Sequence, residues 1–466
     1  MSVMDNVFRF IPEVAAPKEK PSLTSRLKWT LLILVVFFVL GMIPIYGLSA
    51  SAQLGLEHIQ YLLASKIGTI ISVGIGPIVV ASIILQLLVG SKIINMDFSD
   101  PAQRARFSSW QKLLAIILAF FEGFIYVKMG LLAPEPGMFF WVLLQVAIGS
   151  IILLYLDEVV KSYGFGSGIS LFIAAGVAST ILIRIFNPFT QGAGLSIGHA
   201  AINFASADGL LWAFFHNIGT SGFLLSFVNN LLPIIFALVI FFIVVYFEGV
   251  HVNIPLTVGQ RGAMGKYPVK FFYVSNMPVI LAAALFANIH LLAQWIAKGN
   301  SGIFASIFSF IDKVVNPTRS VVLDVLNQAI GGGSEWSYIL SSVGYALLYI
   351  VVLTGACILF GVLWVQMAGQ DSGSLANQLN KSGMYLPGFR RDPRVVKGVL
   401  DRYIPTITVL GSIFVGVMAG FADITGAVGT GMGILLTVDI LYRMYEELVR
   451  EQAPQLLPML GKFMAK

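Results

Sequence analysis

Residues 164–173 read GFGSGISLFI and residues 427–436 read AVGTGMGILL, so two apolar segments of the chain begin with the same Gly-x-Gly pattern. The pattern is Gly166-Ser167-Gly168 in the first segment and Gly429-Thr430-Gly431 in the second. A branched aliphatic residue, Ile173 or Leu436, lies seven positions after the first of these glycines. A shared Pro-x-aliphatic start relates two further segments, residues 76–82 (GPIVVAS) and 277–283 (MPVILAA). These matches indicate an internal repeat, which is typical of membrane transport folds.

The composition favours a protein embedded in lipid. Of 466 residues, 57% are hydrophobic and only 11% are charged, whereas soluble domains average about 25% charged residues. The mean hydropathy is +0.86. A transmembrane helix needs about 20 mostly apolar residues, and the segments that meet this requirement are 29–48, 69–90, 110–131, 138–156, 167–186, 229–248, 270–293, 337–366, 403–422 and 424–446. The sequence therefore predicts an all-α membrane protein with ten transmembrane helices.

The repeat divides these spans into two halves of five, because spans 2 and 5 match spans 7 and 10. An odd number of spans per half gives the two halves opposite orientations, so the symmetry axis lies in the membrane plane. The predicted parts are an amphipathic cytoplasmic segment, the first half, an external loop, the second half and a cytoplasmic tail, at residues 1–28, 29–190, 191–228, 229–450 and 451–466. We expect no cleavable signal peptide, because the first 28 residues contain no apolar core.

Lysine and arginine orient the spans, since cytoplasmic loops carry the excess of basic residues. With the N-terminus inside, 23 of the 29 lysines and arginines fall in cytoplasmic segments. Both termini are therefore expected in the cytoplasm, and the protein is expected to be a multi-pass protein of the cell membrane.

Side chains suited to catalysis or metal binding are sparse. Cys357 is the single cysteine, and the five histidines have no metal-binding spacing, so we expect no metal and no cofactor. The glycine-rich segment 164–168 does not place a glycine two residues before its serine, as a nucleophilic serine of the Gly-x-Ser-x-Gly type requires. The sequence therefore does not predict an enzyme.

Glu122 in span 3 is the most notable ionisable residue within the predicted spans. It is consistent with a proton relay, and equally with a carboxylate that faces a water-filled cavity or a neighbouring subunit. The other acidic residues of the spans lie mainly near cytoplasmic ends, where charge is expected at the interface: Asp157, Glu158 and Glu248, with Asp439 in span 10.

Residues 51–67, between spans 1 and 2, are partly apolar but too few to cross a membrane. Such a segment either lies in the outer interface or folds back into the helix bundle, and hydropathy is compatible with both.

Two cytoplasmic loops, 249–269 and 368–402, combine basic residues with Gly and Pro. The first loop contains Arg261 and Lys266, and the second contains Arg390, Arg391 and Arg394. The positive-inside bias accounts for such charge. The length of the second loop exceeds what orientation needs, so binding to the phosphates of a nucleic-acid-rich partner, or to anionic lipid, is a second interpretation.

Several motifs along the chain resemble the SecY family, the channel-forming subunits of protein translocases, in the archaeal form that is close to the eukaryotic translocon alpha subunit. The motifs are IGPIV (75–79), QLLVG (86–90), QKL (111–113), YLDE (155–158), GSGI (166–169), GKYP (265–268) and YRMYE (442–446). The resemblance runs from the IPEV at residues 11–14 to span 10, and residues 187–228 and 294–336 match least.

The resemblance implies ten helices in two inverted halves around an hourglass pore, and it implies roles for particular residues. The pore ring consists of Ile75, Val79, Ile169, Ile173, Ile280 and Leu436. The plug is segment 51–67, with Leu56, Ile59, Leu62 and Leu63. The lateral gate lies at spans 2 and 7, with Pro77, Val80, Pro278 and Asn288. Ribosome or motor docking falls to Arg261, Lys266, Arg390, Arg391 and Arg394. Val80 departs from the threonine that the family often has after the ring position of span 2, so the polar contacts of this gate are expected to be reduced.

The implied function is that of the pore subunit of a protein-conducting channel, which translocates unfolded secretory polypeptides and releases transmembrane segments into lipid. The implied partners are small SecE-like and Sec beta/SecG-like membrane subunits, the ribosome, the nascent polypeptide with its signal sequence, and the lipid bilayer. Two other classes stay open from the residues alone. One is an ion-coupled transporter of a small hydrophobic solute, which would use Glu122, and the other is a passive scaffold of an assembly complex.

Overall fold

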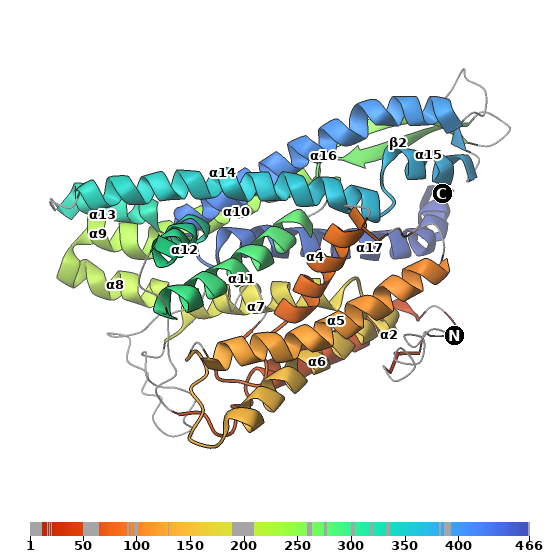
Figure 1. Cartoon of the computed structure of the whole chain (residues 1–466). Helices are drawn as coiled ribbons and strands as arrows, with labels where there is room; N and C mark the ends of the chain where they lie inside the picture. The colour runs from red at the N-terminus through yellow and green to blue at the C-terminus, as the bar shows by residue number, and fades with distance from the viewer. Residues whose placement is uncertain are drawn as a thin grey trace. The chain divides into compact units, whose positions relative to one another are not determined.

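The computed structural model describes residues 12–464 except 16, 18, 20, 50–64, 91, 92, 95, 97–100, 129, 189–208, 259–262, 275, 276, 300–302, 317–319, 332–335, 382, 383 and 386–392. The described residues are mainly helical (Figure 1). The helices up to the middle of the chain are α2 (Leu23–Leu40), α4 (Gly76–Gly90), α5 (Pro101–Lys128), α6 (Phe139–Tyr163), α7 (Gly168–Phe186), α8 (Leu210–Ser221), α9 (Phe223–Ser226), the π-helical turn η1 (Phe227–Leu231) and α10 (Leu232–Glu248). The later helices are α11 (Met277–Gly299), α12 (Ile303–Val315), α13 (Val321–Gly331), α14 (Trp336–Met367), α15 (Ser372–Lys381), α16 (Pro393–Ile424) and α17 (Gly431–Met464).

Every predicted span overlaps one of these helices. Among the described residues, eight helices are long and apolar enough to cross a membrane. The two remaining spans correspond to α4, which is a shorter apolar helix, and to the first part of α17. The structure is therefore compatible with all ten predicted spans, although length and apolarity alone identify eight of them among the described residues.

The bounds of the first span differ from the prediction of 29–48. Helix α2 begins at Leu23, because the side chain of Ser22 accepts a hydrogen bond from the Ser25 backbone N–H at 3.4 Å and caps the helix. It ends at Leu40, and Gly41 follows as its C-cap. Segments expected as external loops also contain helices, with α8 and α9 before α10, and with α12 and α13 before α14.

The chain packs as two compact units. The first consists of Met1–Ser82, Phe107–Ala178 and Leu436–Lys466. Within it α2 packs against α6, and Phe37 of α2 stacks on Phe172 of α7 with ring centroids 4.9 Å apart. Helices α5 and α6 lie side by side (Figure 1), and a Cβ on Gly123 would be 3.0 Å from the Leu143 side chain. Small residues thus allow close helix approach, as is usual in membrane bundles.

The second unit consists of Ile83–Arg106 and Ser179–Leu435. Its most extensive helix contact runs between α14 and α16, which lie side by side in Figure 1. Gly416 faces the backbone of Thr354, and Gly420 faces Ile350, so these glycines let the two helices approach closely. Helix α11 packs against both α12 and α14. These units are defined by packing, and the predicted symmetry between residues 29–190 and 229–450 stays a prediction.

A small sheet joins the two predicted cytoplasmic loops within the second unit. Strand β1 (His251–Val258) pairs antiparallel with β2 (Ala263–Lys270), with His251 opposite Lys270. Strand β3 (Met384–Tyr385) from the later loop pairs with the other edge of β1, giving the order β2-β1-β3. The sequence predicts both loops, but the sheet that connects them is a feature of the structure alone.

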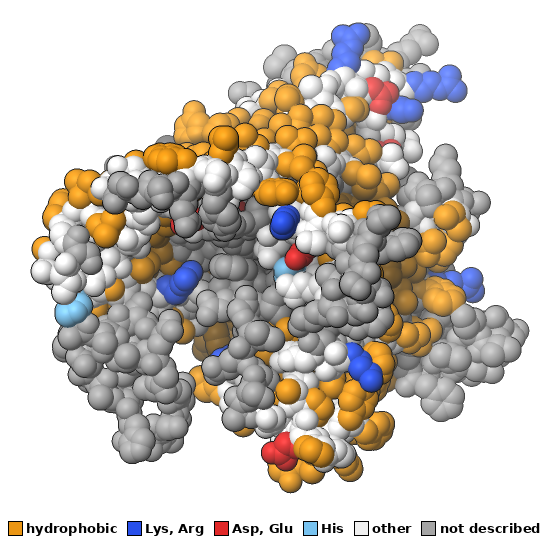
Figure 2. All heavy atoms as spheres, turned by 60° about the vertical axis from the view of Figure 1, so that its left-hand side comes forward, with side chains coloured by type: hydrophobic (Ala, Val, Ile, Leu, Met, Phe, Trp, Pro, Cys, Tyr) orange, Lys and Arg blue, Asp and Glu red, His pale blue; other side chains and the backbone are white. Residues whose placement is uncertain are grey.

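The outer surfaces of the helices are apolar. Leu31 of α2 is 65% exposed, Phe242 of α10 is 66% exposed and Val351 of α14 is 67% exposed. Figure 2 shows hydrophobic side chains over broad areas of one face of the molecule. Exposure of this kind is expected for helices whose solvent is lipid.

Candidate pore and lateral gate

Four of the predicted ring residues lie at matching positions near the starts of their helices. Val79 is the fourth residue of α4, and Ile280 is the fourth residue of α11. Ile173 is the sixth residue of α7, and Leu436 is the sixth residue of α17. Residues that match in the sequence repeat therefore also occupy the same positions within their helices. A chance similarity of apolar residues would not require this agreement.

The six predicted ring residues are buried with one exception. Ile75 and Ile173 are fully buried, and Val79, Ile280 and Leu436 are each less than 9% exposed, whereas Ile169 is half-buried. The carbonyl of Ile75 accepts the first helical hydrogen bonds of α4, from the N–H groups of Ile78 and Val79 at 3.0 and 3.1 Å. The first unit contains five of the six residues, and Ile280 belongs to the second unit.

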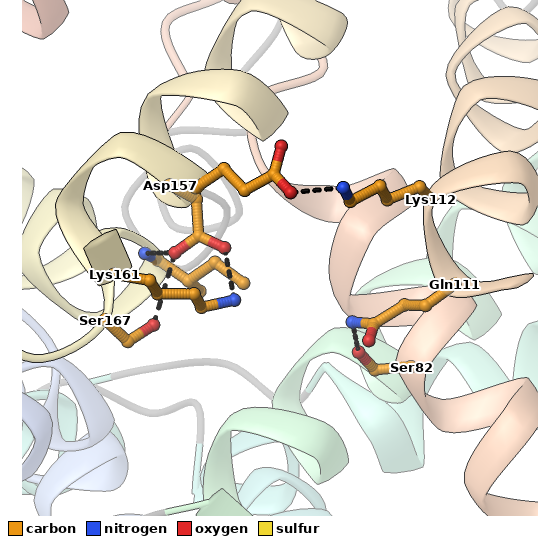
Figure 3. Close-up of polar contacts among 8 residues, drawn as sticks. Ser82, Gln111, Lys112, Asp157, Lys161 and Ser167 are labelled. Atoms are coloured by element: carbon orange, nitrogen blue, oxygen red, sulfur yellow. Dashed lines mark hydrogen bonds and ion pairs between the residues drawn. The ribbon is translucent and has the colours of Figure 1, made fainter. Parts of the chain in front are cut away.

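The start of α7 is held by a carboxylate from the preceding helix. Asp157 of α6 is 3% exposed, and its Oδ1 accepts hydrogen bonds from the Ile169 N–H at 2.9 Å and from the Ser167 hydroxyl at 3.4 Å. Its Oδ2 forms an ion pair with the Lys161 ammonium at 2.6 Å. Figure 3 shows these side chains turned toward one another. Gly166 provides the turn before the helix with φ +65°, a conformation that favours glycine.

The start of α17 is held in a similar way. Asp423 at the end of α16 is 3% exposed, and its Oδ1 accepts a hydrogen bond from the Gly431 N–H at 3.0 Å. Its Oδ2 accepts a hydrogen bond from the Tyr349 hydroxyl of α14 at 2.8 Å. Gly429 and Thr430 form the turn with φ +90° and +61°, and the Thr430 hydroxyl accepts from the Gly433 N–H at 3.1 Å.

Sequence reasoning assigns Asp157 to the membrane interface and does not single out Asp423. In the structure both carboxylates are buried, and each accepts a hydrogen bond from the start of the following helix. Asp157 and Asp423 lie nine and six positions before their Gly-x-Gly patterns, and an acidic residue at such a place is the signal that could have identified them.

The predicted gate prolines begin helices. Pro77 and Pro278 are buried, and each is the second residue of its helix, α4 or α11, where a missing N–H is tolerated. Val80 is half-buried, as is Asn288, whose amide donates to the Ala284 carbonyl of its own helix at 2.8 Å. The Asn288 amide thus bonds within α11, and the expected reduction in polar contacts at the gate stays a prediction.

Helix α4 nevertheless has a polar contact that the sequence does not predict. The Gln111 amide of α5 donates a hydrogen bond to the Ser82 hydroxyl of α4, as Figure 3 shows. Ser82 lies two positions after Val80 and is the last residue of α4 that belongs to the first unit. This contact ties α4 to α5 within the first unit.

A buried cation lies on the same helix as Gln111. Lys112 of α5 has a side chain that is 9% exposed, and it pairs with Glu158 of α6 and, at 3.7 Å, with Glu13. The Tyr163 hydroxyl donates to the Ala15 carbonyl at 2.8 Å. The described residues of the N-terminal segment are thus held against α5 and α6.

The remaining predicted sites are described only in part. The plug residues Leu56, Ile59, Leu62 and Leu63 lie outside the described residues, as do Arg261, Arg390 and Arg391. Lys266 lies in β2 opposite Pro255, and Arg394 is exposed in the first turn of α16. The sheet therefore brings the backbones of the two loops together.

Chemical groups for metal binding are not clustered in the described part of the chain, where no three His, Cys, Asp or Glu side chains are grouped to hold an ion. Cys357 is fully buried. Glu122 is 4% exposed, and its Oε1 accepts no hydrogen bond from the described residues.

Comparison with known proteins identifies the family. The SecY family profile matches residues 69–445. The protein translocase subunit SecY of Methanothermobacter thermautotrophicus is 41% identical over 464 residues, which covers 98% of this chain and 97% of the relative. The subunit SecY of Methanocaldococcus jannaschii is also 41% identical, over 98% of each chain.

Solved structures give the same result. The structure of a protein-conducting channel is similar with a TM-score of 0.79 and 39% identity, covering 98% of this chain and 99% of the other. Sec61 in the canine ribosome-channel complex is similar with a TM-score of 0.77 and 39% identity over the same shares. Since the profile spans most of the chain and the relatives match it nearly end to end, this chain belongs to the SecY family.

Proposed function

We propose that this chain is the pore subunit of a protein-conducting channel, which passes unfolded secretory polypeptides across the membrane and releases transmembrane segments sideways into lipid. The observation that carries the proposal is the placement of buried branched residues at matching positions of repeated helix starts: Val79 with Ile280 and Ile173 with Leu436. The relatives named as translocase subunits and the similar channel structures support it.

The chemistry of these residues suits a seal for a substrate of any sequence. An ion among aliphatic side chains loses its hydration without gaining a ligand, at a cost on the order of tens of kcal/mol by Born estimates. A narrow apolar constriction also dewets and stops ions. A translocating chain meets only weak, unspecific contacts there, so the ring excludes ions without selecting sequences.

Lateral release follows from partition between pore and lipid. A segment of about 20 apolar residues is more stable in the bilayer than in an aqueous pore. Pro77 and Val80 in α4 and Pro278 and Asn288 in α11 mark the helices that flank the exit. The Asn288 amide bonds within its own helix, which favours a gate that opens without breaking that hydrogen bond.

The cytoplasmic loops are the proposed docking site for the ribosome. The pairing of β1 with β2 and β3 gives both loops one common scaffold, and basic residues flank it. A related channel, Sec61, has been solved in a ribosome-channel complex. Further proposed partners are small SecE-like and Sec beta/SecG-like membrane subunits. The proposed location is the cell membrane with both termini in the cytoplasm, in keeping with the basic bias of these loops.

The test is crosslinking of a stalled nascent chain to single cysteines in the ring. Cys357 is the only cysteine and is buried, so a Cys357→Ala background carries Ile173→Cys or Leu436→Cys. The matched control is Val351→Cys, on an exposed apolar face of α14. Efficient crosslinks at positions 173 and 436 with none at 351 are expected. Equal crosslinking at all three positions, or none at the ring, would contradict the proposal.

A further inference from the structure

The two Gly-x-Gly helix starts share a polar arrangement as well as an apolar one. At each start, one oxygen of a buried carboxylate accepts a hydrogen bond from the first turn of the helix: Asp157 from Ile169 in α7, and Asp423 from Gly431 in α17. The other oxygen is held by a separate group, the Lys161 ammonium or the Tyr349 hydroxyl. Each carboxylate is therefore fixed at both oxygens.

Both carboxylates lie on the helix that precedes the one they cap. A Cβ on Gly168 would be 2.5 Å from the Asp157 Cα, and a Cβ on Gly431 would collide with the Ala422 side chain. The glycines thus allow the start of each helix to press against the previous helix, within reach of its carboxylate. The two aspartates differ in spacing, since Asp157 precedes its bonded residue by twelve positions and Asp423 by eight, so the shared feature is the contact and not the sequence register.

The capped residues lie one turn or a little more before the predicted ring residues Ile173 and Leu436. Ile173 follows Ile169 by four positions, and Leu436 follows Gly431 by five. An α-helix advances about 1.5 Å per residue, so the height of the first turn sets the height of the ring side chain. The first N–H groups of a helix have no intrahelical partner, and away from water they require one.

We propose that Asp157 and Asp423 are positioning residues of the pore seal, which fix the axial height of Ile173 and Leu436 by holding the starts of α7 and α17. This inference rests on the proposed function, because the height of these side chains matters only if they line a pore. Each aspartate acts on its own helix, so the two effects are separable.

The experiment reads height directly. Full-length protein in proteoliposomes, in the Cys357→Ala background, carries either Ile173→Cys or Leu436→Cys as a reporter. Stalled nascent chains bearing a photocrosslinker at successive positions then give a crosslinking profile for each reporter. The measured quantity is the nascent-chain position at which crosslinking is strongest, not the crosslinking yield. A variant that only inserts less protein therefore leaves this position unchanged.

Asp157→Ala should shift the peak of the position-173 reporter and leave that of the position-436 reporter in place, and Asp423→Ala should do the reverse. Loss of the cap frees up to about one turn, or about 5.4 Å. A shift of about one to two nascent-chain residues is expected, since an extended chain spans about 3.3–3.6 Å per residue. Asp157→Asn and Asp423→Asn retain an acceptor oxygen and should restore the wild-type peaks.

Matched variants separate positioning from general stability. Asp371 caps α15, where its Oδ2 accepts from the N–H groups of Gly373 and Ser374 at 3.1 and 3.2 Å, and that helix carries no ring residue. Asp371→Ala should shift neither peak. If the alanine variants fail to insert, Lys161→Met and Tyr349→Phe remove only the second partner of each carboxylate. These should broaden the peak of the reporter at position 173 and at position 436, respectively.

Two results would overturn the inference while leaving the channel function intact. The first is an unshifted peak in inserted Asp157→Ala and Asp423→Ala protein. The second is an equal shift of both reporters in either variant, which would mark a general loss of structure. Absence of crosslinks to both reporters in the protein with intact aspartates would instead overturn the proposed function itself.

Discussion

In the proposed channel, individual side chains at the starts of α7 and α17 decide which solutes pass. Ile173 is fully buried and Leu436 is 1% exposed, so their methyl groups contact protein closely. A side chain of this kind excludes ions by lacking any ligand for them. At this scale the account depends on size and apolarity, and both can be changed one residue at a time.

Replacing Ile169 and Ile173 with serine should raise ion leakage at least several-fold, because the change both widens and wets the constriction. Single-channel conductance in planar bilayers measures it. Ile183→Ser is the matched control, since Ile183 lies on the same helix but is 56% exposed. Equal conductance of the ring variant and the control would contradict the seal.

Glu122 tests the alternative of an ion-coupled transporter. Its carboxyl is buried in α5, where a proton relay would need it to ionise. For a channel, Glu122→Gln keeps the shape of the side chain and should leave translocation of a secretory protein unchanged, both with and without a proton gradient. Loss of transport that also depends on the gradient in the unmodified protein would favour the transporter.

Among the elements, the plug is the part of the account that rests on sequence alone. Deleting Leu56–Leu63 should make the channel open transiently while the protein still inserts, because residues 51–67 are too few to form a span. Bilayer recordings of opening frequency check this. Deleting residues 191–198 of the predicted external loop is a control of equal length. Failure of only the plug deletion to insert would make the segment structural.

A second prediction at the scale of elements concerns the predicted cytoplasmic loops. Reversing Arg390 and Arg391 to glutamate should preserve topology, since the other basic residues of the cytoplasmic segments still orient the chain. Ribosome binding should weaken. The logarithm of the affinity falls with the logarithm of the salt concentration, and the loss of two phosphate contacts makes this fall less steep by about 1.4–1.8 units.

Ribosome co-sedimentation across a salt series measures that slope, and a topology assay accompanies it. Lys462→Glu with Lys466→Glu makes the same charge change in the predicted cytoplasmic tail and is the control. Identical slopes for the two double variants and the unmodified protein would reduce these arginines to orienting charge.

The elements also show what a single sequence can predict. Long apolar runs such as Phe139–Tyr163 and Trp336–Met367 are predictable because hydrophobicity over about 20 residues is a strong signal. The start of α2 at Leu23 is not, since a capping contact from Ser22 extends the helix into polar sequence. The pairing of Thr257 with Tyr385 also escapes prediction, because it joins loops more than 120 residues apart.

The residues of the candidate site also divide into those that the sequence can predict and those that it cannot. Helix position of Ile173 and Leu436 follows from local repeats, which the sequence displays. The roles of Asp157 and Asp423 depend on which N–H groups lie near their carboxylates, and such contacts depend on backbone turns at Gly166 and Gly429 that hydropathy does not register.

For the whole molecule, apolar outer surfaces and buried aliphatic residues at repeated helix starts fit the proposed channel, with lipid around the helices and an apolar seal in the pore. Such a channel offers a polypeptide two routes, one across the membrane and one sideways into the bilayer. A polar chain crosses, and a chain with about 20 consecutive apolar residues leaves for the bilayer. The central claim is that unfolded polypeptide passes the ring of this chain.

The most direct test is protease protection of a secretory preprotein in proteoliposomes that contain the full chain with SecE-like and Sec beta-like subunits. In the Cys357→Ala background, a bulky thiol reagent is attached to Ile173→Cys or, as a control, to Val351→Cys. The account predicts that the preprotein becomes protected in the control and stays digestible when position 173 carries the reagent. Equal protection in both would contradict the claim that the polypeptide passes through this ring.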